Sequence, residues 1–179
     1  MKRLLLVFLT ATFMGCAPTS QLIQIPRFSA AWQIDPGYGD IPSVKEVSQT
    51  MIVFYVHWEK TFGDRNKKVK KALNGLMIEW SNKRRLVKAQ GWTTDGRKIN
   101  KGYINGATLA PGYIWVRVRG DKKVSSSSLV HEMVHVSLWA VDPHGRGDAD
   151  HEGSMYYGWT RKHTELIKKV NNALKQIGL

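Results

Sequence analysis

Five consecutive residues have the types and the spacing that metal chemistry needs: His131-Glu132-Met133-Val134-His135, an HExxH pattern. On a helix, residues four apart lie on one face one turn apart, so both imidazoles can reach one metal ion. Imidazole nitrogen is a good zinc ligand. Glu132 would project beside that ion, where its carboxylate can take a proton from a bound water. The spacing therefore predicts a Zn²⁺ site with His131 and His135 as ligands and Glu132 as the base.

A catalytic zinc ion needs a third protein ligand and one open position. Four of the six histidines of the chain fall within residues 131–151, so the loop after the motif supplies candidates. His151 is the first candidate, because the Gly-Asp-Ala-Asp turn before it can fold the chain back under the helix. His144 is the alternative, since it lies near the helix end in a fixed Pro-His-Gly setting. Acidic side chains stay open as ligands or as groups that orient the histidines: Asp148, Asp150, Glu152 and Glu165.

Apolar periodicity and turn residues predict the elements that must position these side chains. Ser43 and Glu46 form a capping box before apolar residues at helical spacing. The expected helices span about 43–61, 64–74, 126–141 and 158–177, the strands about 76–80 and 114–119, and turns between short strands fill 90–113. This order predicts a compact α+β domain: a small antiparallel sheet packed against the helix of the motif, with an N-terminal and a C-terminal helix.

Residues 1–16 are typical of an export signal. Lys2 and Arg3 precede a short apolar stretch, and the small residue Gly15 comes before Cys16. We expect a signal peptide over 1–16, a tether and extended lead-in over 17–42, where Pro, Ser, Gly and Gln are frequent, and one domain over 43–179.

The end of this signal, Phe13-Met14-Gly15-Cys16, resembles the lipobox of bacterial lipoproteins. Phe13 stands where Leu is commoner, and Met14 is bulkier than is typical. The resemblance implies that Cys16 is lipidated, which would anchor the protein to a membrane. By the same resemblance, a residue other than Asp after the cysteine points to the outer membrane.

Composition narrows the class of protein. The chain has 179 residues, 42% apolar and 23% charged, which fits one folded domain and excludes a disordered chain. A single cysteine excludes an intramolecular disulfide and a zinc site made of cysteines alone. No apolar run is long enough to suggest a protein with several membrane spans.

The positive charge is concentrated in one stretch. The chain has 27 Lys and Arg against 14 Asp and Glu, and residues 60–101 contain 13 of the former and 3 of the latter. Three interpretations stay open: a solvated face, attraction to an anionic surface such as phospholipid, lipopolysaccharide or cell-wall polymer, and nucleic-acid binding. The export signal argues against nucleic acid.

The motif and its surroundings resemble those of zincin-type metallopeptidases, of the short bacterial lipoprotein kind. The similarity lies in HExxH followed by a Gly-Asp-x-Asp-His loop and Trp159; it covers about 131–159 by motif and about 75–170 by element order. It implies a zincin-like fold, His151 as the third zinc ligand, and hydrolysis of peptide bonds in which Glu132 passes the water's proton to the leaving nitrogen.

The chain departs from the metzincin pattern, because Leu138 and Val141 stand where that pattern requires Gly and His. A Pro-His-Gly setting also occurs in SprT-like proteins, which keeps His144 open as a ligand. Candidate oxyanion donors are Tyr156, Tyr157 and His163.

The analogy further implies that the strand over 114–119 pairs with an extended peptide substrate. The competing function is a non-catalytic basic envelope lipoprotein that binds anionic lipid or cell-wall polymer, with structural zinc or none. A closed site that uses both His144 and His151 would favour that alternative.

Overall fold

The computed structural model describes residues 20–24, 29–34, 42–83, 85–87, 91–92, 98–99, 102–118, 123–148, 151 and 158–179. The predictions for the signal peptide and Cys16, and those for Asp150, Glu152, Tyr156 and Tyr157, lie outside the described residues.

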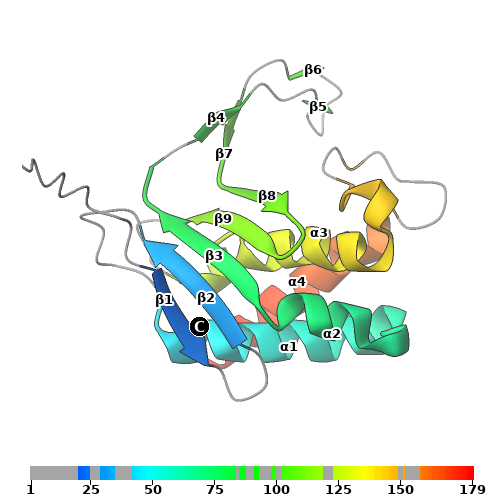
Figure 1. Cartoon of the computed structure of the whole chain (residues 1–179), viewed down its shortest axis with the longest axis horizontal. Helices are drawn as coiled ribbons and strands as arrows, with labels where there is room; N and C mark the ends of the chain where they lie inside the picture. Colours follow the sequence, from blue (N-terminus) through cyan, green and yellow to red (C-terminus); the bar gives the residue numbers. More distant parts are fainter. Residues whose placement is uncertain are drawn as a thin grey trace, which may run out of the picture.

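Five strands form the main sheet, in the order β1-β2-β3-β9-β8 (Figure 1). They are β1 (Ser20–Gln24), β2 (Ser29–Ile34), β3 (Leu76–Ser81), β8 (Gly106–Ala110) and β9 (Tyr113–Arg117). The strands β1 and β2, which the sequence did not predict, lie within the segment 17–42.

The α+β class is confirmed, but the expected antiparallel sheet is wrong, because the sheet is mixed. The pairs β1–β2 and β8–β9 are antiparallel, whereas β2–β3 and β3–β9 are parallel. The antiparallel pairs are strands that follow one another in the chain with only a few residues between them. Long connections separate β2 from β3 and β3 from β9, which is what parallel pairing requires.

Two further strand pairs occur in and just before the region 90–113, where the sequence predicts turns between short strands. The strand β4 (Arg85–Val87) pairs with β7 (Gly102–Ile104), and β5 (Gly91–Trp92) pairs with β6 (Lys98–Ile99). Both pairs are antiparallel and lie beyond the main sheet in Figure 1.

Four α-helices accompany the sheet in the described part of the chain: α1 (Val44–Phe62), α2 (Lys68–Leu73), α3 (Leu129–Val141) and α4 (Arg161–Gln176). Short 3₁₀ turns lie at η1 (Arg65–Lys67), η2 (Val124–Ser126) and η3 (Pro143–Gly145). No described helix combines the length and the apolarity needed to cross a bilayer.

The starts of the helices follow local capping chemistry. The predicted capping box is present: Ser43 Oγ accepts from the Glu46 N–H at 3.3 Å, and the Glu46 carboxylate accepts from the Ser43 N–H. The helix α3 begins at Leu129, later than the expected 126, because η2 precedes it. The N-cap residue Ser128 makes no side-chain bond to this helix, and Ser127 Oγ accepts from the free Leu129 N–H at 3.2 Å instead.

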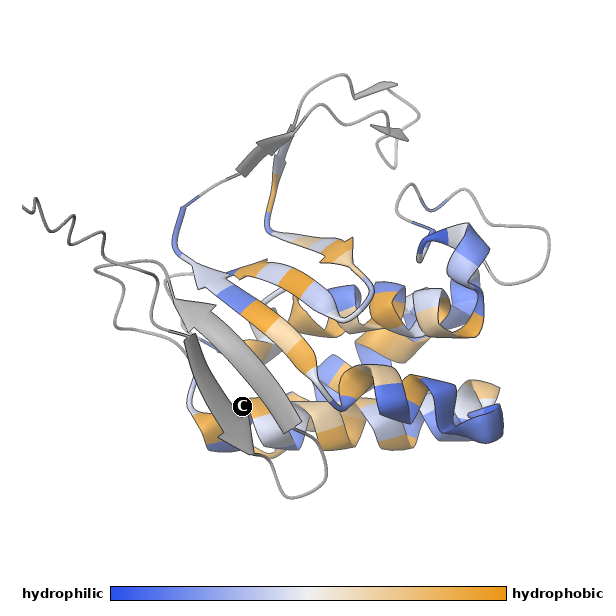
Figure 2. Ribbon diagram, viewed as in Figure 1, coloured by the Kyte–Doolittle hydropathy of each residue, from blue (hydrophilic) through white to orange (hydrophobic). Residues whose placement is uncertain are grey.

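The core lies between the sheet and the helices, and α3 runs along β8 and β9 (Figure 1). Figure 2 shows the apolar residues along α3 and the central strands. Ile114, Trp115 and Val116 are consecutive and buried, as expected for a strand covered on both faces. The strand β9 therefore lies inside the sheet, between β3 and β8, and has no free edge. The prediction that the strand over 114–119 pairs with a peptide substrate is thus wrong. The edge of the described sheet beside α3 is β8.

Candidate metal centre

Three histidine side chains meet between α3 and the loop that follows it. The Nε2 atom of His135 lies 3.1 Å from His131 Nε2 and 3.0 Å from His151 Nε2. The ligand atoms of all three lie within 4.8 Å of one another. Nitrogen ligands about 2.0–2.1 Å from a common tetrahedral ion are roughly 3.4 Å apart, close to these spacings. The three imidazoles could therefore hold a metal ion.

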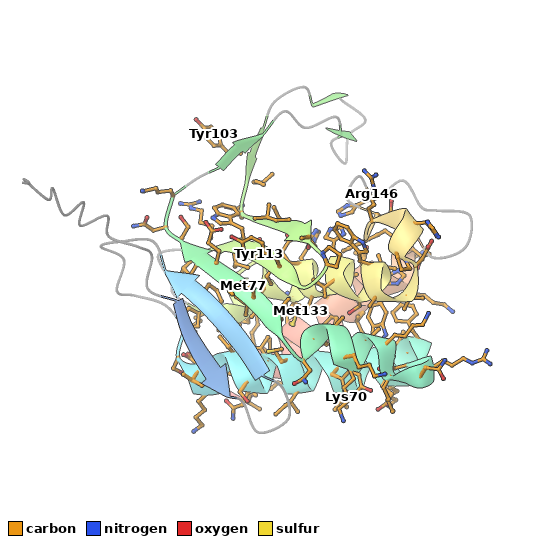
Figure 3. The ribbon with its side chains drawn as sticks, viewed as in Figure 1. Lys70, Met77, Tyr103, Tyr113, Met133 and Arg146 are labelled. Atoms are coloured by element: carbon orange, nitrogen blue, oxygen red, sulfur yellow. The ribbon has the colours of Figure 1, made fainter. Side chains whose placement is uncertain are left out.

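Helical geometry brings two of these rings together, and a turn with unusual backbone angles brings the third. His131 and His135 are one turn apart on α3. Between α3 and His151 the chain passes through the turn marked by Arg146 in Figure 3, and φ is positive at Arg146 (48°), Gly147 (76°), Asp148 (53°) and His151 (57°). Residues other than glycine rarely adopt positive φ angles unless the surrounding structure fixes them. Such residues are found often at functional sites.

Gly147 connects this turn to the metal centre. The Nδ1–H of His135 donates to the Gly147 carbonyl at 2.7 Å, so the Nε2 of the neutral ring keeps its lone pair for a metal. A hydrogen bond of this kind orients most metal-ligating histidines in proteins. A Cβ at position 147 would lie 2.6 Å from the His135 carbonyl oxygen, so only glycine fits this approach.

The ring of Trp159 packs against all three histidines. Its centroid lies 4.9 Å from that of His131, 4.8 Å from His135 and 4.2 Å from His151, where the rings are stacked. The indole N–H donates to Thr164 Oγ1 at 3.1 Å. The backbone N–H of Trp159 donates to the Asp148 carboxylate. Trp159 thus fixes the ring cluster to the start of α4.

Glu132 lies between α3 and the edge strand β8, and only 3% of its surface is exposed. Thr108 Oγ1 on β8 donates to Glu132 Oε2 at 2.9 Å, beside the register shift between Thr108 and Ala110. Such irregularities in pairing re-aim side chains near active sites. At Gly106 a Cβ would lie 2.5 Å from Glu132 Oε1. The glycine therefore lets β8 approach the carboxyl group closely.

Burial sets the charge state of the cluster. It lowers the pKa of His131 to about 3, with His135 and His151 adding to the effect. It also lowers the pKa of His135 to about 4. Both imidazoles are therefore neutral at neutral pH, the form that binds metal. Burial raises the pKa of Glu132 to about 7, against the opposing hydrogen bond from Thr108.

The other predicted residues have different partners. His144 is exposed at the start of η3, where its N–H donates to Asp142 Oδ1 at 3.1 Å, and it is not in the histidine group. Glu165 forms an ion pair with Lys168 at 3.3 Å on α4. Asp148 bonds to Trp159 as described, so it orients the cluster. His163 is buried, its ring stacks on Phe62 at 4.3 Å, and its Nδ1 accepts from the Thr160 N–H at 2.9 Å.

Sequence reasoning missed Thr108, Gly106 and the contact of Trp159 with the histidines. The glycine and aspartate content of the 142–153 loop was a signal for a tight turn, and Gly147 belongs to it. Thr108 and Gly106 lie in an ordinary strand, and no local pattern distinguishes them. No protein-family model, curated protein or solved structure matches the chain, so any functional assignment depends on the geometry of this site.

Proposed function

We propose that the chain is a zinc-dependent peptidase of the bacterial envelope, in which Glu132 is the general base. The observation that supports this most is the convergence of three imidazole Nε2 atoms, two of them from α3, the helix that also carries the buried carboxyl group of Glu132. A nitrogen donor set of this size fits zinc, because catalytic zinc sites use three protein ligands and keep one position open.

In this proposal the protein supplies positioning and proton transfer. The turn at Gly147 and the ring of Trp159 hold the three imidazoles in place. Glu132 takes a proton from the attacking water and gives it to the leaving nitrogen, a role suited to a carboxyl group with a pKa of about 7. A bound zinc ion would supply a Lewis acid that polarises the scissile carbonyl.

The edge strand β8 is the proposed binding surface for the substrate backbone. It replaces the strand over 114–119, because β9 is paired on both sides, with β3 and with β8. One side of β8 pairs with β9, and among the described strands no other pairs with it. An extended peptide added to this edge would pass the Thr108–Glu132 contact, where the base lies.

The envelope location is part of the proposal and depends on the lipobox-like segment ending at Cys16. Lipidation at Cys16, with the outer membrane as the expected site, would keep the domain at a membrane surface. Attraction of the basic 60–101 stretch to anionic lipid or cell-wall polymer would add to this attachment.

The test is Glu132→Gln, which keeps the size of the side chain but removes the base. Hydrolysis of a quenched-fluorescence peptide library should fall by about 10²–10⁴-fold, while zinc bound per chain, measured by elemental analysis, stays the same. The matched control is Glu165→Gln, an acid-to-amide change on the outer surface of α4. Undiminished cleavage by Glu132→Gln would overturn the mechanism.

The alternative is a non-catalytic basic lipoprotein that binds an anionic polymer, with structural zinc or none. A closed site with four ligands would favour it. Among the described His, Cys, Asp and Glu side chains, the group contains His131, His135 and His151, and His144 is outside it. This arrangement supports the enzyme over the alternative. The alternative predicts salt-sensitive binding to cell-wall material without any cleavage.

A further inference from the structure

We propose that a second pocket, where α1 ends and α4 begins, binds a single-chain anionic amphiphile: an alkyl chain with one anionic headgroup. The pocket has a volume of about 770 Å³, within the range of sites for small molecules. None of the three histidines of the metal centre lines it. The inference is therefore independent of the proposed peptidase activity.

The inner wall of this pocket is apolar. Trp58 and Phe62 come from the last turns of α1, and Leu138 and Val141 come from the end of α3. Trp58 is 2% and Leu138 4% exposed. A pocket with buried aromatic and aliphatic walls is suited to an alkyl chain, since each methylene that leaves water gains binding free energy.

The rim of the pocket is cationic. Arg65 and Lys68 come from η1 and the start of α2, whereas Arg161 and Lys162 come from the first turn of α4. All four side chains are exposed, and none forms an ion pair with another residue in the described part of the chain. Figure 2 shows the strongly hydrophilic start of α2 in this region. Two basic segments distant in sequence thus meet at one opening.

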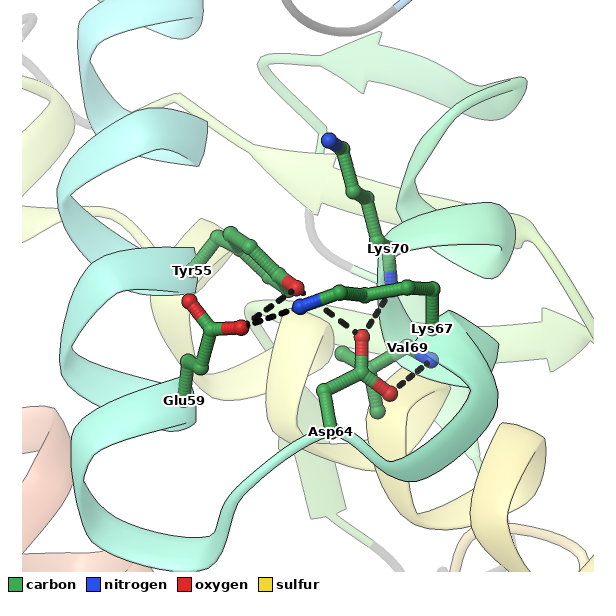
Figure 4. Close-up of polar contacts among 6 residues, drawn as sticks. All are labelled: Tyr55, Glu59, Asp64, Lys67, Val69 and Lys70. Carbon is green, nitrogen blue, oxygen red and sulfur yellow. Dashed lines mark hydrogen bonds and ion pairs between the residues drawn. The ribbon is translucent and has the colours of Figure 1, made fainter.

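Asp64, the one acid among the described residues that line the pocket, has a structural role. Its Oδ1 accepts from the Val69 N–H and its Oδ2 from the Lys70 N–H, both at 3.0 Å (Figure 4). The Tyr55 hydroxyl donates to Oδ2 at 3.1 Å. Because these bonds engage both carboxylate oxygens, Asp64 fixes the corner between α1 and α2, and with it the segment that contains Arg65.

Charge and shape together select the ligand. Four cations against one acid, at the positive end of the α4 dipole, favour an anionic headgroup. Lys67 differs from these cations, because it is paired with Glu59 on α1 (Figure 4). An inorganic anion would leave the apolar wall uncovered, and a neutral amphiphile would leave the cations without a partner. A ligand with one alkyl chain and one anionic group covers the apolar wall and also pairs with the cations.

The experiment is calorimetric titration of the full chain with octyl phosphate below its micelle concentration. We expect saturable binding of one molecule per chain, with and without a metal chelator. Hexyl phosphate should bind about tenfold more weakly, as expected when two methylenes are lost from an apolar wall. Inorganic phosphate and octyl glucoside, each of which lacks one half of the ligand, should bind at least tenfold more weakly than octyl phosphate.

Two charge reversals on the same helix give the matched comparison. Lys162→Glu, at the rim, should weaken binding of octyl phosphate at least tenfold, whereas Lys175→Glu, at the far end of α4, should change it less than twofold. Arg65→Glu provides a second rim variant on a different segment, and thermal melts show that each variant folds. Equal losses in Lys162→Glu and Lys175→Glu would attribute binding to overall charge and overturn the site. Equal affinity for inorganic phosphate or for octyl glucoside would also overturn it.

Discussion

At the scale of single residues, the position of His151 depends on backbone conformations that few residues other than glycine adopt. Positive φ angles at Arg146, Asp148 and His151 itself turn the chain back to α3. The Asp148 carboxylate then binds the Trp159 N–H, which holds the returning chain to the start of α4. The third imidazole is thus placed by the loop and by Trp159 together.

The first prediction distinguishes the two histidines that the sequence left open. His151→Ala should abolish stoichiometric zinc binding, because it removes one of three convergent nitrogens. His144→Ala should leave zinc at one ion per chain, since that side chain is exposed and outside the group. Elemental analysis of the two purified variants provides the measurement. Loss of zinc in His144→Ala with retention in His151→Ala would reverse the assignment.

A second prediction concerns Trp159 as a residue that positions the histidines. Trp159→Leu should weaken zinc affinity by about 10–100-fold, the usual effect of losing a group that orients metal ligands. Trp159→Phe keeps an aromatic ring but not the N–H bond to Thr164, so its loss should be smaller. Competition with a chromogenic chelator measures both. If Trp159→Leu bound zinc as tightly as the unchanged chain, Trp159 would not position the histidines.

At the scale of elements, the contact between β8 and α3 creates the environment of Glu132. The strand approaches the helix closely enough that a Cβ at Gly106 would lie 2.5 Å from Glu132 Oε1 and 2.7 Å from Ser128 Cβ. The same strand supplies the Thr108 hydroxyl to the carboxylate. The base is therefore held by a strand that is not its neighbour in sequence.

The third prediction follows from this close approach. Gly106→Ala should destabilise the fold by about 1–3 kcal/mol, because the added methyl forces the strand and the helix apart. Gly106→Val should be more severe, since its side chain is larger. Urea unfolding of each variant measures the change. If Gly106→Ala matched the unchanged chain in stability, the contact between β8 and α3 would have to be looser than described.

The elements that the sequence predicted well are those with strong local signals. The capping box at Ser43 fixed the start of α1, and the HExxH spacing placed His131 and His135 on one helix. The antiparallel direction predicted for the sheet was wrong, because the parallel pairing of β3 with β2 and with β9 depends on contacts distant in sequence. Thr108 was missed for the same reason: its partner Glu132 lies on another element.

At the scale of the whole molecule, the buried histidines make stability depend on pH once metal is removed. The pKa of His131 is about 3 and that of His135 about 4, below the ordinary value of 6.5. Burial also lowers the pKa of His163. Below pH 6.5 the unfolded chain binds protons that the folded chain does not, so the free energy of unfolding falls as pH falls toward 4.

Glu132 acts in the opposite direction. Its pKa of about 7 exceeds the ordinary value of 4.5, so its protonation adds stability as pH falls through this interval. Below pH 6.5, two or more histidines outweigh one carboxyl group. The fourth prediction is therefore a lower urea midpoint at pH 5 than at pH 6.5 in chelator. The double change His131→Asn with His135→Asn should abolish or reverse this difference, because the opposing effect of Glu132 remains; an unaltered difference would locate its origin elsewhere.

The order of strands in the main sheet also has a geometric consequence for a chain anchored at its N-terminus. The strand β1 lies at one edge of the sheet and β8 at the other. Four spacings of about 4.8 Å separate these edges by roughly 19 Å. Cys16 precedes β1 by only a few residues, so an acyl chain there would attach the molecule by the edge distant from Glu132. The histidine cluster would then face away from the lipid and be open to polymers approaching from the aqueous side.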